Sequence, residues 1–303
     1  MKSVTSAALL GLAAVAALSP ASAQGREERP ERDTSDLSGQ VSVTGVLASD
    51  RGDDEDEAAR SGIILRGGLD YDRDLGAGEI RLSYDSAAYL YEDDDRPDRW
   101  SNRLALRYGL EVADDVELSG RLSYATNLAT LEFRSADQAE VLGMVEYSPG
   151  DHRIRLTGGW RWRDYDDSTG SESSGPFAGA EYRYRLARDQ YLSAELRYED
   201  IDSSDPRRGY HRAIAEAFYQ HPLGEMTQLR LGGSARWWRF DERLAPNGER
   251  RRDSVIAPEV QLLHDFRSGF LLRGRLQYGI RESNDPNEDG DDRRATLTAG
   301  YRF

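Results

Sequence analysis

Apolar and polar side chains alternate along most of the chain, in segments that polar connectors separate. Side chains of a β-strand point alternately to its two faces, so this period of two predicts strands with one apolar and one polar face. Fourteen segments carry the pattern, which predicts an all-β protein. The predicted strands cover residues 39–49, 61–72, 78–91, 99–112, 116–128, 137–148, 152–164, 176–187, 190–201, 209–221, 226–240, 254–266, 269–281 and 293–303.

Connectors of two kinds alternate between these strands. The short ones are turn-like and centre near residues 75, 114, 150, 188, 224 and 268. The long ones are polar and acidic and cover residues 50–60, 92–98, 129–136, 165–175, 202–208, 241–253 and 282–292. This order is that of an up-and-down antiparallel barrel with both chain ends on the side of the short turns. We expect about 14 strands, within a range of roughly 12–16.

The alternation gives the two faces of the barrel opposite chemistry. The apolar face is expected to point outward and the charged face inward. A shift of register by one residue would place the charges in hydrocarbon, at roughly 2–4 kcal/mol each near the membrane midplane. The pattern therefore predicts a transmembrane barrel with a polar interior. Clear outward residues are Ile80, Leu82, Tyr84, Leu104, Leu106, Leu122 and Leu276, and clear inward ones are Glu79, Arg81, Arg103, Arg107, Glu195, Arg197 and Glu199.

Aromatic residues concentrate near the ends of the predicted strands, as expected for girdles at the two membrane interfaces. Toward the long connectors lie Tyr89, Tyr91, Trp100, Trp162, Tyr165, Phe177, Tyr210, Trp237, Trp238 and Phe240. Toward the short turns lie Tyr71, Tyr147, Tyr184, Tyr191, Tyr219, Phe266, Phe270, Tyr301 and Phe303. A soluble β-sandwich would bury its apolar face in a core and would need no girdle.

Composition narrows the class of membrane protein. Charged residues make up 31% of the chain, mean hydropathy is −0.73, and no long apolar run follows residue 23. These values exclude an α-helical membrane protein, whereas a barrel needs only alternate residues to face lipid. The formal net charge of −15 argues against nucleic acid as a partner. The chain has no Cys, which excludes disulfides and thiolate chemistry.

The N-terminal 38 residues lack the alternation. Lys2 is followed by an apolar stretch over 7–18, and Ala21-Ser22-Ala23 forms a small-residue cleavage site. These features predict a secretory signal peptide over residues 1–23. Residues 24–38 are charged and are expected to form a disordered periplasmic leader. The predicted barrel domain covers residues 39–303.

The last strand alternates down to an aromatic residue at the end of the chain. Ala295, Leu297, Ala299, Tyr301 and Phe303 share its apolar face. This strand resembles the closing strand of bacterial outer-membrane β-barrels, and the architecture is similar to that of fourteen-stranded monomeric porins. The resemblance implies a place in the Gram-negative outer membrane, with lipid and lipopolysaccharide as surroundings and both termini periplasmic. It also implies recognition of the C-terminal strand, ending at Phe303, by the barrel assembly machinery. We expect a monomer.

Inward-facing arginines outnumber inward-facing acids, which suggests two interpretations. The arginines could form cross-strand ion pairs that hold the wall together. They could also line a pore for anionic solutes, because guanidinium binds carboxylate and phosphate in a bidentate manner. The densest group lies on the strands over 152–201. The candidate pore-lining residues are Arg153, Arg155, Arg161, Arg163, Arg183, Arg185, Arg197, Arg273 and Arg275.

Evidence for catalysis or metal binding in the sequence is weak. Asp285, Asn287 and Asp289 match the start of a Ca²⁺ loop, but Thr296 stands where such a loop has Glu. Only His211 is near the predicted outer rim, after the serines of the 202–208 connector. We expect a channel for small hydrophilic, in particular anionic, solutes, with no cofactor and no catalytic residues. A plugged structural or assembly barrel is the alternative, and an outer-rim hydrolase is a lesser one.

Overall fold

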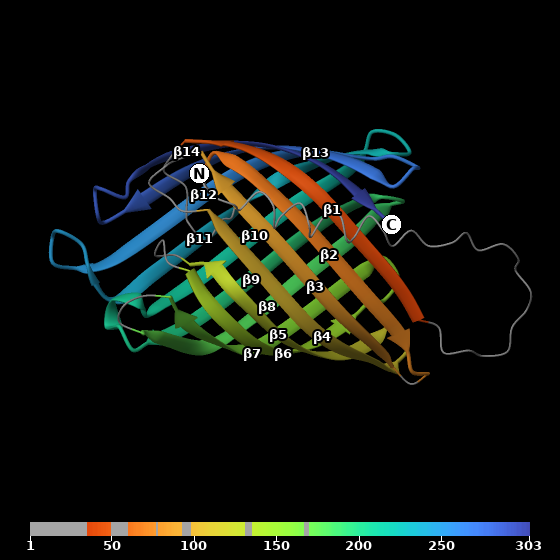
Figure 1. Cartoon of the computed structure of the whole chain (residues 1–303), viewed down its shortest axis with the longest axis horizontal. Coiled ribbons are helices and arrows are strands. Elements are labelled where there is room, and N and C mark those ends of the chain that lie inside the picture. The colour runs from red at the N-terminus through yellow and green to blue at the C-terminus, as the bar shows by residue number, and fades with distance from the viewer. Residues whose placement is uncertain (1–34, 50–59, 77, 93–97, 131–134, 167–169) are drawn as a thin grey trace, which may run out of the picture.

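The computed structural model describes residues 35–49, 60–76, 78–92, 98–130, 135–166 and 170–303. It is a closed antiparallel barrel in which each strand pairs with the next and β14 pairs with β1 (Figure 1). The strands are β1 (Ser35–Ala48), β2 (Gly62–Asp74), β3 (Glu79–Tyr91), β4 (Arg99–Ala113), β5 (Val116–Ala129), β6 (Ser135–Tyr147), β7 (His152–Tyr165), β8 (Glu172–Ala187), β9 (Gln190–Ser203), β10 (Tyr210–Pro222), β11 (Thr227–Leu244), β12 (Arg250–Asp265), β13 (Phe270–Ser283) and β14 (Gly290–Arg302). The all-β fold and its fourteen strands are confirmed.

The main differences from the predicted boundaries lie at the long connectors. β11 runs on to Leu244 and β12 begins at Arg250, so the connector predicted over 241–253 shrinks to 245–249. In Figure 1 this light-blue hairpin extends beyond the barrel wall. Residues here are polar on both faces, so the hydrophobic alternation stops while the backbone pairing continues. Arg251 and Asp253, which are buried and bonded to each other at 2.8 Å, stabilise this extension.

The first strand also begins earlier than expected. β1 starts at Ser35 and pairs with β2 from Ser35 opposite Arg73 onward, so residues 35–38 are strand and not leader. Backbone pairing needs no apolar side chain, and this stretch has little alternation to reveal it. The predicted signal peptide over 1–23 and the rest of the leader lie outside the described residues.

The outer face of the barrel is apolar over its whole circumference. Leu122, Leu196 and Leu276 are 58–62% exposed, and the other residues predicted to point outward share that face. Contiguous apolar surface of this extent is typical of a membrane-facing protein. A closed barrel can meet lipid because it leaves no strand edge with unpaired backbone groups. Within the described residues, no helix is long and apolar enough to span a membrane.

The short turns and connectors have well-defined local chemistry. Asp115 and Asp189 adopt positive φ angles of 63° and 59° in two-residue turns, a backbone region that Asp tolerates better than most residues. Before β10, Asp205 caps the short 3₁₀ helix η1 (Pro206–Arg208). Hydrogen bonds from Arg207 hold the pKa of Asp205 below its usual range. The connectors thus stabilise strand ends on both sides of the barrel.

The seam between β1 and β14 closes at the last residue. Gly39 and Phe303 exchange two backbone hydrogen bonds, of 2.9 and 3.0 Å. A Cβ on Gly39 would lie only 2.6 Å from the ring of Phe303, so the ring would have to move to admit a larger residue. Arg302 N donates to the carbonyl of Gly269 in the turn before β13. The chain therefore ends beside the short turns, as predicted.

Candidate functional site

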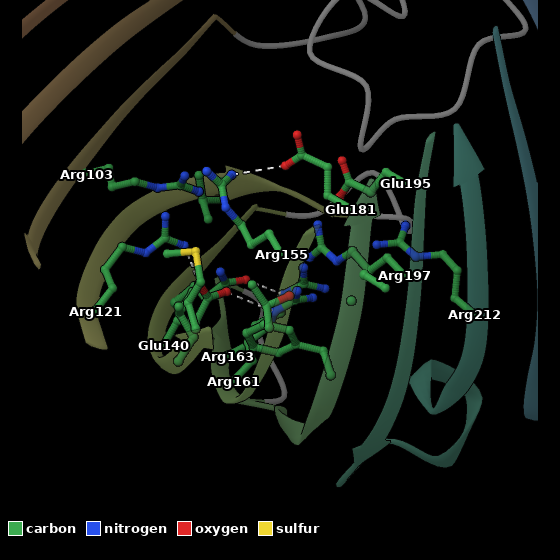
Figure 2. Close-up of a pocket in the computed structure, with 18 of the residues that line it drawn as sticks. Arg103, Arg121, Glu140, Arg155, Arg161, Arg163, Glu181, Glu195, Arg197 and Arg212 are labelled. Atoms are coloured by element: carbon green, nitrogen blue, oxygen red, sulfur yellow. Dashed lines mark hydrogen bonds and ion pairs between the residues drawn. The ribbon is translucent and has the colours of Figure 1, made fainter. Parts of the chain in front are cut away.

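Three polar cavities in the interior of the barrel are lined by described residues. The first measures about 500 Å³, the second about 530 Å³ and the third about 330 Å³. Arg197 and Arg212 line both the first and the second, Arg103 the first and the third, and Arg66 the second and the third. The three cavities therefore adjoin one another around the lumen. Figure 2 shows the first, with charged side chains from β4 to β10 pointing into it.

Toward the short turns, the predicted arginine wall converges on one carboxylate. Glu181 on β8 binds Arg153 at 2.7 Å, Arg155 at 3.0 Å and Arg183 at 3.4 Å. Arg155 also bonds Glu146 on β6 at 2.6 Å. These side chains remain partly exposed, so water screens the pairs. The wall predicted to hold surplus arginine is largely a cross-strand ion-pair ladder at this level.

Toward the long connectors, a second carboxylate binds another three arginines. Glu199 on β9 lies 3.1 Å from Arg161, 2.6 Å from Arg197 and 2.8 Å from Arg212. Its side chain has no exposed area, and those of Arg161 and Arg212 are only 3% and 7% exposed. A buried carboxylate is costly unless it is paired, so these arginines are what allows Glu199 to remain ionised. We call Glu199, Arg161, Arg197 and Arg212 the Glu199 cluster.

Part of the predicted aromatic girdles lies inside the barrel, so that prediction is wrong for six buried residues of the outer girdle. It is also wrong for Tyr91, which stacks on Tyr89, and for Tyr191, which lies against Arg183 and hydrogen-bonds Gln220. On each strand they share the face of the inward arginines. Odd-numbered and even-numbered residues of a strand face opposite sides, and this parity decides the orientation of a side chain at any distance from the strand end. Phe240, for example, packs edge-on against Tyr210 at 6.4 Å between ring centroids, beneath Arg243 and Arg251. Trp100, Trp162 and Trp237 do face outward. The buried six are Tyr89, Tyr165, Phe177, Tyr210, Trp238 and Phe240.

The remaining candidate arginines occupy different parts of the lumen. Arg163 is buried and donates to Gln138 at 2.9 Å. Arg185 is exposed at the short-turn end and lines none of the three cavities. Arg273 and Arg275 line the second cavity, on β13. The nine candidates therefore do not form one track.

Sequence reasoning missed several residues that line the cavities. Arg212 and Arg236 were predicted to face inward but were not among the pore-lining candidates, and both line the second cavity. Arg66 on β2 lines the second and third cavities. The apolar Ile64 has the same parity as Arg66 and is buried, which obscured the polar face of β2. The odd or even position of each Arg in its strand is enough to predict that all three side chains face the lumen.

The loop between β13 and β14 uses its carboxylates internally. Oδ1 of Asp285 accepts two hydrogen bonds of 3.1 Å from the backbone and side-chain amides of Asn287. Asp289 accepts one from the backbone of Ser283. Among the described residues, no group of three His, Cys, Asp or Glu is arranged to hold a metal ion. The residues that suggested the start of a calcium loop, Asp285, Asn287 and Asp289, thus form hydrogen bonds within the loop.

His211 lies on the outward face near the long connectors, between two carboxylates. Its Nδ1 is 2.9 Å from Asp200 on β9, and its Nε2 is 3.4 Å from Asp241 on β11. The hydroxyls of Ser203 and Ser204 donate instead to the carbonyl of Glu172. The serines and the histidine therefore bond to different partners and not to each other.

Comparisons with known proteins agree with this fold. No family model matches the chain, and no curated protein matches it in sequence. A loop-deletion variant of OmpT, an outer membrane protein of Vibrio cholerae, superposes with a TM-score of 0.56 at 11% identity, over 90% of this chain and 100% of that one. The outer membrane channel DcaP of Acinetobacter baumannii gives 0.55 at 12% identity, over 89% and 97%. An anion-selective porin from Comamonas acidovorans gives 0.52 at 12% identity, over 90% and 100%.

These similarities concern architecture, because the sequence identities are low. The chain shares the closed antiparallel barrel fold with these outer membrane proteins and porins. What distinguishes this chain is the arrangement of charge in its lumen.

Proposed function

We propose that the chain is a passive channel for small hydrophilic, in particular anionic, solutes, and not an enzyme. One observation carries this proposal: a closed barrel with an apolar outside encloses three adjoining cavities whose lining contains more arginine than acid. Guanidinium groups attract and bind carboxylates and phosphates. The name of one structural neighbour, an anion-selective porin, is in line with this chemistry.

A planar-bilayer recording of the purified, folded protein tests the proposal. We expect stepwise single-channel currents and, under a KCl gradient, a reversal potential displaced toward that of chloride. Acidic residues outside the barrel oppose this selectivity, but solvated charges are screened beyond about 8–10 Å at physiological salt. A reversal potential at or on the potassium side of zero would contradict the proposed anion preference.

A plugged structural or assembly barrel is the second candidate, and the packing toward the long connectors favours it. The Glu199 cluster and the buried aromatic residues lie at that end of the interior. Barrels of eight strands are filled by side chains and those of sixteen leave a channel, so fourteen lies between the two regimes. The absence of current steps from protein shown to be folded and inserted would support this candidate over the channel.

We further propose that the chain lies in the outer membrane as a monomer, with the long connectors outside the cell and both ends in the periplasm. The terminal strand, closed by Phe303 against Gly39, supports recognition by the barrel assembly machinery. An epitope inserted at Asn247-Gly248 should bind antibody on intact cells, whereas one at Gly150 should not. Surface labelling at Gly150 would reverse this orientation.

A further inference from the structure

The second cavity borders a wall on which the sequence analysis named Arg273 and Arg275 as pore-lining candidates, outside the densest arginine group. On this wall, Arg273 of β13 stands opposite Thr298 of β14, and Thr298 stands opposite Thr44 of β1. The hydroxyls of Thr44 and Thr298 are 2.7 Å apart. All three residues line the cavity. The barrel seam thus places one guanidinium beside two hydroxyl groups at the same level of the lumen.

Three other arginines of this cavity have carboxylate partners. Arg275 binds Glu259, which Gln261 also contacts, and Glu259 is itself buried. Arg197 and Arg212 belong to the Glu199 cluster. Their charge is therefore compensated within the wall, and their side chains are held in place.

Arg273 differs from these neighbours. Among the described residues, it is the one arginine lining the second cavity that makes no hydrogen bond, ion pair or ring contact. Its Nε is buried without a partner. Guanidinium has five N–H donors and no acceptor, and it bonds most strongly to acceptors that carry a negative charge. Thr298 can add a hydroxyl donor to the same ligand.

The cavity also contains a group that opposes anions. Glu216 on β10 is the one acid among its lining residues, and no described residue bonds to its carboxylate. It stands directly opposite Glu195 on β9. These two negative charges weaken the attraction of any anion that enters, so Arg273 and Glu216 should affect binding in opposite directions.

We propose that the second cavity is a binding site for a small oxyanion, a carboxylate or a phosphate, held by Arg273 and Thr298. The inference deepens the proposed channel function and rests on it only in that the solute must reach the lumen. It places the anion-selective contact at the β13–β14–β1 seam and not on the Arg153–Arg197 wall, where Glu181 and Glu199 already bind the arginines.

Calorimetric titration of the full folded barrel in detergent at low salt tests this site, with inorganic phosphate and succinate as separate probes. We expect saturable binding of at least one probe, and the two titrations show which oxyanion is preferred. Arg273→Gln should weaken that binding roughly tenfold or more, because a charge-assisted contact is lost. Glu216→Gln should strengthen it. Arg155→Gln is the matched control and should leave affinity unchanged, since Arg155 lies among Glu146 and Glu181.

Each outcome has one interpretation once the folded state of every variant is verified by its resistance to unfolding in gel electrophoresis. Unchanged affinity in Arg273→Gln, an equal loss in Arg155→Gln, or no binding of either probe would overturn the site. Bilayer recordings of the same preparations keep the two proposals apart. Current steps without oxyanion binding would contradict the proposed site and support the proposed channel. Oxyanion binding without current steps would support the site and contradict the channel.

Discussion

The two ends of the lumen use the same kinds of side chain to different effect. At the long-connector end, Glu199 has no exposed area and binds three arginines. Phe240, which is 1% exposed, packs against Tyr210, whose hydroxyl lies 3.5 Å from Glu199. At the short-turn end, Glu181 also binds three arginines, but its side chain is 18% exposed and that of Arg183 38%. The number of ion pairs is equal. The degree of desolvation differs between the two ends, and it decides how much stability is lost when one partner of an ion pair is removed.

The largest expected effect comes from removing the buried carboxylate. Glu199→Gln removes the carboxylate that Arg161, Arg197 and Arg212 share, although Arg161 keeps a longer contact of 3.8 Å to Glu140. We expect the variant to lower the free energy of unfolding by about 3–5 kcal/mol. Urea unfolding in lipid vesicles, followed by tryptophan fluorescence, measures the change. The matched control is Glu146→Gln, which removes a partly exposed partner of Arg155 and should cost less than about 1 kcal/mol. Equal losses in the two variants would remove the distinction between the two ends.

Truncation of a buried aromatic residue should come next. Phe240→Ala should lower the free energy of unfolding by about 3 kcal/mol, at the low end of such substitutions because Arg243 and Arg251 lie against the ring and can fill the space. If the packed end limits conduction, single-channel current should rise in this variant. Tyr191→Ala, in the wetter end, should leave the current unchanged. A larger current in the Tyr191 variant would indicate that the constriction lies at the short-turn end instead.

A smaller effect is expected at the seam. Gly39→Ala places a methyl group against the ring of Phe303 and should lower the free energy of unfolding by about 1–3 kcal/mol. Gly45→Ala on the same strand is the control, because no atom lies within 4 Å of the added carbon. Unfolding in urea compares the pair. If both variants behaved like the wild type, the contact between Phe303 and Gly39 would contribute nothing to closure.

The smallest effect belongs to the screened ladder. Arg153→Gln removes one of three arginines from Glu181 and should change the free energy of unfolding by less than about 1 kcal/mol. It should nevertheless shift the reversal potential slightly toward that of potassium, because one cation is lost from a wet part of the lumen. A loss of stability as large as that of Glu199→Gln would show that water does not screen this end.

The sequence predicted the strands well because alternation reports a physical constraint. Each outward residue meets an apolar medium and each inward one a polar interior, so a shift of one residue is costly, and Leu104 or Arg161 can occupy only one face. The predicted strand boundaries were wrong where that constraint ends. Beyond the apolar outer surface, as between Asp241 and Arg252, both faces are mostly polar and backbone pairing continues without the alternation.

The candidate site was predicted less well, for a reason of a different kind. Parity shows that Arg155 and Arg273 both point inward, but not which carboxylates stand beside them. That depends on strand register, which places Glu181 opposite Arg155 and Thr298 opposite Arg273. Side-chain reach then decides which pairs form. The buried aromatic residues show the reverse case, because parity alone would have placed Phe240 and Tyr210 inside.

The seam between β1 and β14 also determines when the barrel can be completed. Thr44 and Thr298 are 254 residues apart in the chain, whereas every other strand pair joins neighbours in sequence. Closing so long a loop costs conformational entropy before any contact is gained, so this pairing should form last. Until then, β1 and β14 each present an open edge that can accept a foreign strand. A folding factor that pairs with these edges would bind the chain only while the barrel is unfinished, and would be displaced when Phe303 meets Gly39.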